Sequence, residues 1–440
     1  MSRSRLIENL SQQVYPNLQA TNLQGYNAQV PGPLIRATTG RKFVVRSINH
    51  VTSPASIPLH GSPSRPVFDD VIEKNEYKDY VYPDEAARTL WYHDHPVHIT
   101  AENVFSGQAG FYIIIDPAVE ATLDLPQGNY DIPLLIQDKI YLASGQTLSP
   151  ATEETNQLGY YGHVIHVNSV PWPFLNVKPR KHRFRLLDGS SSRSYKITIE
   201  QANGVKVPIV VVGTDSGFME APVTTDNMIL AIAERYEVIV DFTAYAGQSL
   251  TMKNARSFSL NPEFEKTNLV MQFNVGTAVS SAAGNGPVPN SLVDLNFPTD
   301  TGIDKRFRFE RRNGQWVVNG VGFADVNNRI LAAPTQGSTE IWELQNFSGG
   351  WAHPIHVRLV GFKVLTRSGR VHCHNTIHED QDMMAVFDVN NTKANPSQGD
   401  QFSNPLNPTF VAKPYSSTDP VQVQSLVLPY FANLNIYPSD

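Results

Sequence analysis

Short runs of β-branched and aromatic residues recur along most of the chain, and several of them alternate apolar with polar positions. Examples are "RKFVVRSI" at 41–48, "YKITIE" at 195–200 and "YEVIVDF" at 236–242. Clusters of Gly, Pro, Asn and Asp separate these runs, which is typical of strands joined by turns. No long pattern with the 3.6-residue period of an amphipathic helix competes with them. We therefore predict an all-β chain made of sandwich or barrel domains.

A weak internal repeat suggests that one kind of domain occurs three times. The segments 30–50, 167–188 and 318–346 each begin at a Val-x-Gly or Val-Asn turn and run through a variable stretch into a strand with alternating charge. A repeat of this kind indicates several copies of one structural unit, although all-β domains can share similar turns between strands by chance. The expected domains are 1–118, 119–280 and 281–440.

The composition is that of a folded protein, and together with the charge it argues against some classes of binding partner. Hydrophobic residues make up 41% of the 440 positions and charged residues 17%, which suits a packed core. The net charge is −6 and no basic stripe is present, so we expect no nucleic-acid partner. No run approaches the ~18 apolar residues of a membrane helix, and the N-terminal sequence lacks the apolar stretch of a signal peptide. We expect no membrane partner, and localisation stays open.

The segment "VHCHNTIHEDQDMM" at 371–384 concentrates metal-binding side chains and holds the chain's single cysteine. In an extended strand His372 and His374 face one way and Cys373 the other. The thiolate can then bind one metal while the two imidazoles reach a second. A thiolate, two imidazoles and a weak thioether form the ligand set of a blue-copper electron-transfer site. The candidates for that set are His353, Cys373, His378 and Met383.

Further histidines lie upstream in short clusters. His353 and His356 share the string "HPIH", "WYHDH" places His93 and His95 on one face of a strand, and "PLHG" contributes His60. A lone histidine is more often structural than a ligand, but this set recurs in separate domains. Zinc is the rival metal, although the CxxC-type spacing of structural zinc sites is absent.

Taken together, these strings resemble the multicopper oxidases, most of all the fungal bilirubin oxidases. The resemblance covers nearly the whole chain and is strongest in "LHGSPSRPVFD", "TLWYHDH", "HITAENVFSGQAGFY", "HPIH" and "HCHNTIHEDQDMM". It implies three cupredoxin-like Greek-key domains, with copper as the cofactor. It also implies a type 1 copper in the last domain and a trinuclear type 2/type 3 cluster between the first and last. A small aromatic donor would supply electrons, dioxygen would accept them, and we expect a monomer.

The resemblance also assigns roles to individual residues. The type 1 ligands are His353, Cys373, His378 and Met383. The type 3 ligands are His60, His93, His95, His372 and His374, and the type 2 ligand is His356. Asp69 and Glu379 match carboxylates that handle protons near the copper sites.

Three features depart from the family's pattern. Pro58 stands where a type 2 ligand is expected, and Arg358 replaces a type 3 ligand. Arg358 carries a permanent positive charge that would oppose a bound cation. His356 and His372 are only 16 residues apart, where the family has several dozen more, so the third domain is expected to be shortened. We favour a mis-joined sequence at 370–371 over a genuine loss of the residues between His356 and His372. His98 is a candidate substitute for a missing copper ligand.

Three function classes follow from these observations. The favoured one is a copper oxidoreductase that acts on phenolic or tetrapyrrole-like donors, with phenol coupling in secondary metabolism as one setting. The alternatives are a copper-poor descendant used for binding or scaffolding, and a blue-copper electron carrier that no longer reduces dioxygen. Copper stoichiometry with a visible and EPR spectrum distinguishes the three.

Overall fold

The computed structural model describes residues 2–62, 71–82, 84–96, 98–150, 159–255, 264–279, 281–295, 302–335, 337–349, 353–357, 360–366, 383–387 and 412–415. Strands dominate this part of the chain, and its α-helices are α1 (Thr100–Ser106) and α2 (Pro117–Leu123). Neither helix is long and apolar enough to cross a membrane. The all-β prediction is confirmed.

The first unit is a sandwich of two sheets. One sheet has the order β2 (Thr21–Tyr26), β1 (Ser2–Gln12), β4 (Phe43–Asn49), β6 (Glu76–Tyr82), β26 (Lys413–Pro414). The other has the order β3 (Ile35–Thr38), β8 (Ala109–Ile115), β7 (Arg88–His93), β5 (Leu59–His60). Side chains from both sheets, such as Val45 and Tyr112, meet in one buried cluster. The strands that carry candidate metal ligands, β5 and β7, therefore belong to a packed sandwich.

The second unit is a larger sandwich. Its first sheet has the order β11 (Val170–Pro171), β10 (Val164–Val167), β9 (Asp131–Lys139), β13 (Lys181–Asp188), β18 (Arg235–Asp241), β15 (Ile209–Thr214), β16 (Gly217–Thr225). Its second sheet has the order β12 (Phe174–Val177), β20 (Leu269–Val275), β19 (Ser249–Asn254), β14 (Tyr195–Glu200), β17 (Met228–Leu230).

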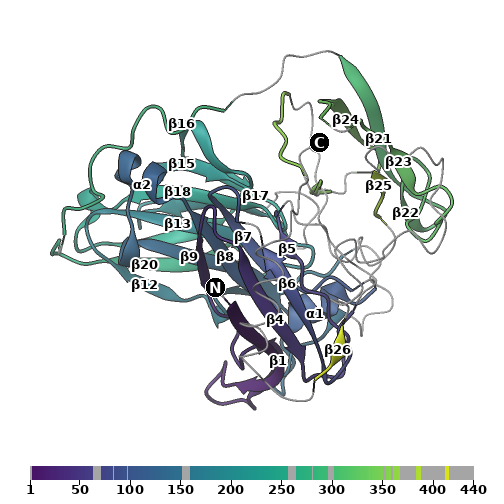
Figure 1. The fold of residues 1–440 in the computed structure, drawn as a ribbon. Coiled ribbons are helices and arrows are strands. Elements are labelled where there is room, and N and C mark those ends of the chain that lie inside the picture. The colour runs from purple at the N-terminus through teal and green to yellow at the C-terminus, as the bar shows by residue number, and fades with distance from the viewer. Residues whose placement is uncertain are drawn as a thin grey trace.

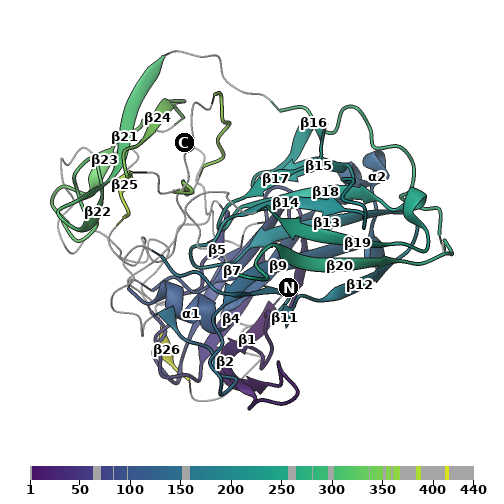
Figure 2. The same ribbon diagram turned by 180° about the vertical axis from the view of Figure 1, so that it is seen from behind.

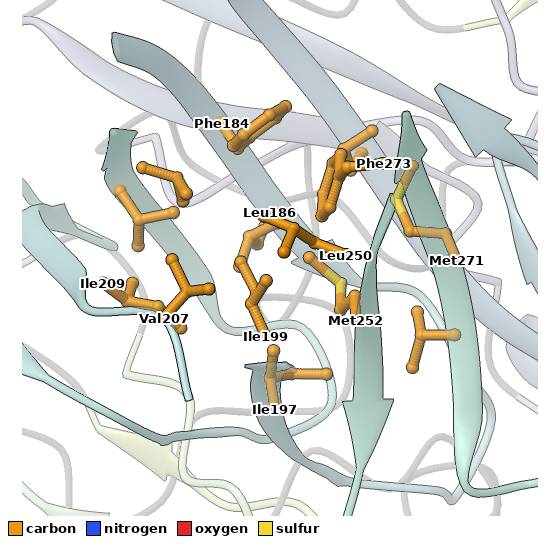
Figure 3. Close-up of a cluster of buried hydrophobic side chains, with 14 of the residues drawn as sticks. Phe184, Leu186, Ile197, Ile199, Val207, Ile209, Leu250, Met252, Met271 and Phe273 are labelled. Carbon is orange, nitrogen blue, oxygen red and sulfur yellow. The ribbon is translucent and has the colours of Figure 1, made fainter. Parts of the chain in front are cut away.

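The core of the second unit follows the two-residue period of its strands. Phe184 and Leu186 project from β13 toward Ile197 and Ile199 of β14, and Figure 3 shows them meeting between the sheets. Each pair is separated by two positions, so both side chains lie on the inner face of their strand. The alternation that predicts strands in the sequence is therefore the pattern that fills this core.

The third unit is described only in part. One sheet has the order β22 (Gln315–Val318), β21 (Ile303–Arg312), β24 (Ile341–Asn346), and β23 (Ile330–Ala332) pairs with β25 (Val386–Phe387). Its buried cluster gathers around Trp316 and includes Phe309 and Met383. These strands lie to one side of the other two units in both views (Figures 1 and 2).

The three units share one pattern of strand pairing. In each, a strand pairs antiparallel with the next strand and parallel with a later one: β1 with β2 and β4, β9 with β10 and β13, β21 with β22 and β24. Each second sheet also contains a parallel pair: β3 with β8, β12 with β20, β23 with β25. This matches the internal repeat in the sequence. The expected boundaries near 118 and 280 stay a prediction.

One strand returns from the far end of the chain to the first unit. In β26, Lys413 lies opposite Tyr77 of β6, and the backbone N–H of Tyr415 donates to the carbonyl of Asn75 at 2.7 Å. The Tyr415 ring lies against His50 and Tyr77. Figure 1 shows β26 in yellow beside β6. The start of β6, at the outer edge of the first sheet, is thus paired with a segment more than 300 positions later.

A buried ion network joins the first unit to the second. The Asp131 carboxylate of β9 accepts from Arg36 of β3 at 2.8 Å and from Nε of Arg185 at 2.7 Å. Arg185 also contacts Glu237 of β18 at 2.7 Å, and the hydroxyl of Thr89 on β7 donates to Glu237 at 2.6 Å. Because Thr89 and Arg36 come from the first unit, the network fixes the ligand-bearing strand β7 against the second.

Candidate metal centre

Three histidines of the first unit converge at the ends of two paired strands. His60 ends β5 and His93 ends β7, with His60 opposite Trp91 in the antiparallel pair. His95 follows just beyond β7, and its ring stacks on that of His93 with 3.7 Å between centroids. The ligand atoms of the three imidazoles lie within 4.8 Å of one another, and all three side chains are buried. This spacing suits a shared metal ion.

The backbone fixes which ring nitrogens of His93 and His95 face the cluster. Nδ1 of His93 lies 2.8 Å from the carbonyl oxygen of Asp94, and Nδ1 of His95 lies 3.0 Å from that of His93. A carbonyl only accepts, so each Nδ1 carries the proton and each Nε2 keeps its lone pair. Nε2 of His93 lies 3.0 Å from Nδ1 of His60. Neutral imidazoles oriented in this way are good ligands for copper, so the residues present fit the metal.

A fourth histidine reaches this cluster from the third unit. The ring of His356 stacks on that of His60, with 4.0 Å between centroids and 28° between planes. The structure thus brings together predicted ligands that are almost 300 positions apart in the sequence. Their role as type 2 and type 3 copper ligands stays a prediction.

The segment before His60 offers no ligand where the family's pattern has one. Pro58 is buried and has no side-chain donor atom. Its neighbour Ile57 is held on both sides, because the Ile57 N–H donates to the hydroxyl of Tyr80 at 2.9 Å and its carbonyl accepts from Tyr82 at 3.0 Å. His98, considered as a substitute, is exposed and lies outside the three-histidine group.

Two of the predicted type 1 ligands lie in the core of the third unit. His353 is buried, its Nε2 lies 2.6 Å from the hydroxyl of Ser348, and its ring meets Trp316 edge-on at 5.2 Å. Met383 is 7% exposed and packs in the cluster that contains Trp316. The remaining predicted site residues lie outside the described residues: Asp69, Arg358, His372, Cys373, His374, His378 and Glu379.

Sequence reasoning missed several residues that surround the three histidines. Trp91 stacks on His93 with 3.8 Å between ring centroids and is 1% exposed. The carboxylate of Asp94 accepts from the backbone of Ser56 and from the side chain of Asn103 on α1. In "WYHDH" the acid alternates with the histidines, and in an extended segment that spacing predicts that it points the other way. That alternation was the available signal for Asp94.

Comparisons with known proteins agree with this geometry. The family model described as "Multicopper oxidase" matches residues 9–119. A bilirubin oxidase from Albifimbria verrucaria is 39% identical, over 93% of this chain and 80% of the relative. A laccase from Bacillus subtilis (strain 168) is 31% identical, over 82% and 78%. Among solved structures, the 2F4 variant of the multicopper oxidase McoA from Aquifex aeolicus superposes with a TM-score of 0.78 at 25% identity, covering 89% of this chain and 96% of that one.

Two details of these matches bear on the predictions. The alignment with the bilirubin oxidase spans 462 positions although this chain has 440 residues, so the relative contains residues that this chain lacks. The relatives include a Bacillus laccase, so the similarity is not restricted to fungal-type enzymes. The identity and coverage of the bilirubin oxidase match show that this chain belongs to the multicopper oxidase family, copper-dependent oxidoreductases that use oxygen as the electron acceptor.

Proposed function

We propose that this chain oxidises phenolic or tetrapyrrole-like donors in one-electron steps at a type 1 copper and passes the electrons to dioxygen at a copper cluster. The observation that carries the proposal is the convergence of His60, His93 and His95 from the first unit with His356 from the third. Three buried imidazoles with a fourth, half-buried one from another unit stacked on them are expected of a metal centre, and rarely of a structural core.

The chain's own residues prepare this centre in three ways. The carbonyls of His93 and Asp94 hold the Nδ1 protons, so that Nε2 of each ring is available to a metal. Trp91 covers one side of His93 and, with the buried neighbours, keeps bulk water out. His356 crosses from the third unit, where His353 and Met383 are candidate type 1 ligands. When bound, copper supplies the one-electron redox chemistry.

The donor class is proposed from the relatives and from the site together. The matched proteins are named bilirubin oxidase and laccase, and a small aromatic donor gives up single electrons readily. Asp69 and Glu379 are proposed to supply protons for the reduction of dioxygen. A phenol or a tetrapyrrole is therefore the first donor to test, and phenol coupling in secondary metabolism would be a consistent setting.

We propose further that Pro58 and Arg358 weaken the cluster. Pro58 contributes no ligand atom, and a guanidinium in the place of an imidazole opposes a cation. The type 2 position then keeps His356 as its assigned ligand. Oxidation of phenols by the unmodified chain should be slow, and turnover should release some partly reduced oxygen.

The test measures copper per chain, the visible spectrum and oxygen uptake with a simple phenol and with bilirubin. His93→Ala should lose copper and oxygen uptake together. His50→Ala is the matched control, because His50 packs against Tyr415 and is not part of the three-histidine group, and it should behave like the parent. A parent chain that binds no copper favours the scaffold alternative. A blue chain that never consumes oxygen favours the electron carrier.

A further inference from the structure

We propose that Asp94 is a positioning residue that sets the spacing between the segment carrying His60 and the strand carrying His93 and His95. The inference rests on the proposed function, because the spacing matters through the metal that these histidines hold. Asp94 is fully buried and stands between the two histidines in sequence, and its carboxylate accepts from the backbone of Ser56 and from the side chain of Asn103.

The Asp94 carboxylate ties three pieces of backbone together. One oxygen accepts from the backbone N–H of Ser56 at 2.7 Å, and the other accepts from the amide of Asn103 on α1. The same Asn103 amide donates to the carbonyl of Pro54 at 3.2 Å. The loop before His60, the end of β7 and helix α1 therefore meet at one buried carboxylate.

Ser56 completes the connection in the reverse direction. Its carbonyl accepts from the backbone N–H of His95 at 2.7 Å, while its own N–H donates to Asp94. Residues 94 and 95 are thus joined to Ser56 by two bonds that run in opposite directions. Ser56 lies only four positions before His60, so this pair of bonds fixes where the His60 segment lies relative to β7.

The orientation of the His93 and His95 rings depends directly on the backbone of this segment. Both Nδ1 protons are held by main-chain carbonyls of the same short segment, those of His93 and Asp94. A shift or rotation of that segment would turn both rings at once. Groups that orient metal-binding histidines typically change metal affinity by about 10–100-fold when they are lost. Here the carboxylate acts one step further out, by holding the carbonyls in place.

The chemistry at position 94 requires two acceptors. The Ser56 N–H and the Asn103 amide both donate, so both oxygens of residue 94 must accept. Asparagine has nearly the same shape but only one acceptor oxygen, so its NH2 would face one of the two donors. Asp94→Asn therefore breaks the connection with little change in volume, and Asn103→Ser removes the side-chain amide that donates to Asp94 while the carboxylate stays.

Asp79→Asn is the matched control. Asp79 is also a buried carboxylate of the first unit, and it accepts from Arg46 at 2.9 Å through each oxygen. It contacts none of the histidines of the cluster in the described part of the chain. A loss of general stability should therefore affect both aspartate variants, whereas a loss of ligand positioning should affect Asp94→Asn alone.

The experiment has a copper readout and a metal-free readout. Copper retention is measured by competition with a chelator, and amide hydrogen exchange at His95 is measured in the apoprotein. We expect Asp94→Asn to bind the cluster copper roughly 10–100-fold more weakly than the parent, with Asn103→Ser changed in the same direction and Asp79→Asn unchanged. We expect exchange at His95 to be faster in Asp94→Asn than in Asp79→Asn.

The outcomes separate this inference from the proposed function. Equal copper retention in Asp94→Asn and Asp79→Asn overturns the positioning role. If the parent holds no copper that His93→Ala removes, the proposed function fails, and the role of Asp94 is then judged by the apoprotein. In the apoprotein, unchanged hydrogen exchange at His95 in both Asp94→Asn and Asn103→Ser overturns the positioning role of Asp94. If Asp94→Asn does not fold, Asn103→Ser decides both readouts.

Discussion

Asp131→Asn is expected to loosen the attachment of the first unit to the second. Asp131 accepts from Arg36 of the first unit and from two nitrogens of Arg185 in the second, and it is buried. The substitution keeps the shape and one acceptor oxygen but removes the charge. Two guanidinium groups then lose a shared counter-ion, that of Arg185 in a place with little water and that of Arg36 in a partly exposed one.

The pKa of Asp131 sets the size of the effect. Burial alone would raise this pKa, but Arg185 and then Arg183 outweigh burial and lower it to about 2, from an ordinary value of 3.8. At about 1.4 kcal/mol per unit, that difference corresponds to roughly 2 kcal/mol of folding stability. Removing one partner of a buried ion pair typically costs about 3–5 kcal/mol. We expect a loss of about 2–4 kcal/mol at pH 7.

The sign of the pH dependence follows from the lowered pKa. Stability from Asp131 is fully present above about pH 4, where the unfolded chain is also ionised, and is lost as the pH falls toward about 2. The asparagine variant lacks this contribution at every pH. The difference between the parent and Asp131→Asn should therefore be largest at neutral pH and shrink between about pH 4 and pH 2.

Urea unfolding followed by circular dichroism at pH 7, 4 and 2.5 measures this difference. Asp226→Asn is the control, because Asp226 pairs with Lys206 on the surface, where the two side chains are 57% and 40% exposed. Such exposed pairs contribute little, so its midpoint should not move measurably. A difference for Asp131→Asn below about 1 kcal/mol at pH 7, or one that stays constant down to pH 2.5, would refute the reasoning.

The remaining predictions concern the copper sites and the core. Cys373→Ser should abolish the intense visible band of the copper-loaded protein, and an unchanged absorption spectrum would contradict the type 1 assignment. Met383→Leu should keep the band and raise the reduction potential in a redox titration, because the axial thioether is a weak ligand. Pro58→His combined with Arg358→His should raise copper per chain and oxygen uptake, and elemental analysis that shows no gain would mean that these positions are not ligand sites. Phe184→Ala should lower the stability of the second unit by about 3–5 kcal/mol in urea unfolding, since it removes a fully buried ring.

Much of the fold could be predicted because the two-residue alternation of the strands is visible in the sequence. The runs that became β4, β14 and β18 alternate or stay apolar over strand-like lengths, and turn residues separate them. The long strand β16 was not predicted, because Pro222 interrupts its pattern and it lies at a sheet edge where few of its side chains are buried. The short helices were missed too, since one or two turns do not establish a helical period.

The candidate site could be predicted in part for a similar reason. His93 and His95 share a face by spacing alone, and the structure confirms that their rings stack. The approach of His356 to His60 followed only from the resemblance to known oxidases, because no local pattern links residues so far apart. The role of Asn103 could not be predicted, since it depends on where α1 packs against β7 and not on the sequence around either.

The return of β26 to the first unit has a consequence for the order in which the chain can fold. The pairing partner of Tyr77 is Lys413, so the start of β6 stays unpaired until synthesis has passed residue 413. At about 5–20 residues per second, the intervening chain takes roughly 15–70 s to appear. During that time β6 presents unpaired backbone groups to other nascent chains. β26 pairs with only the first two positions of β6, Glu76 and Tyr77. Its return therefore protects the start of this edge strand from pairing with another chain.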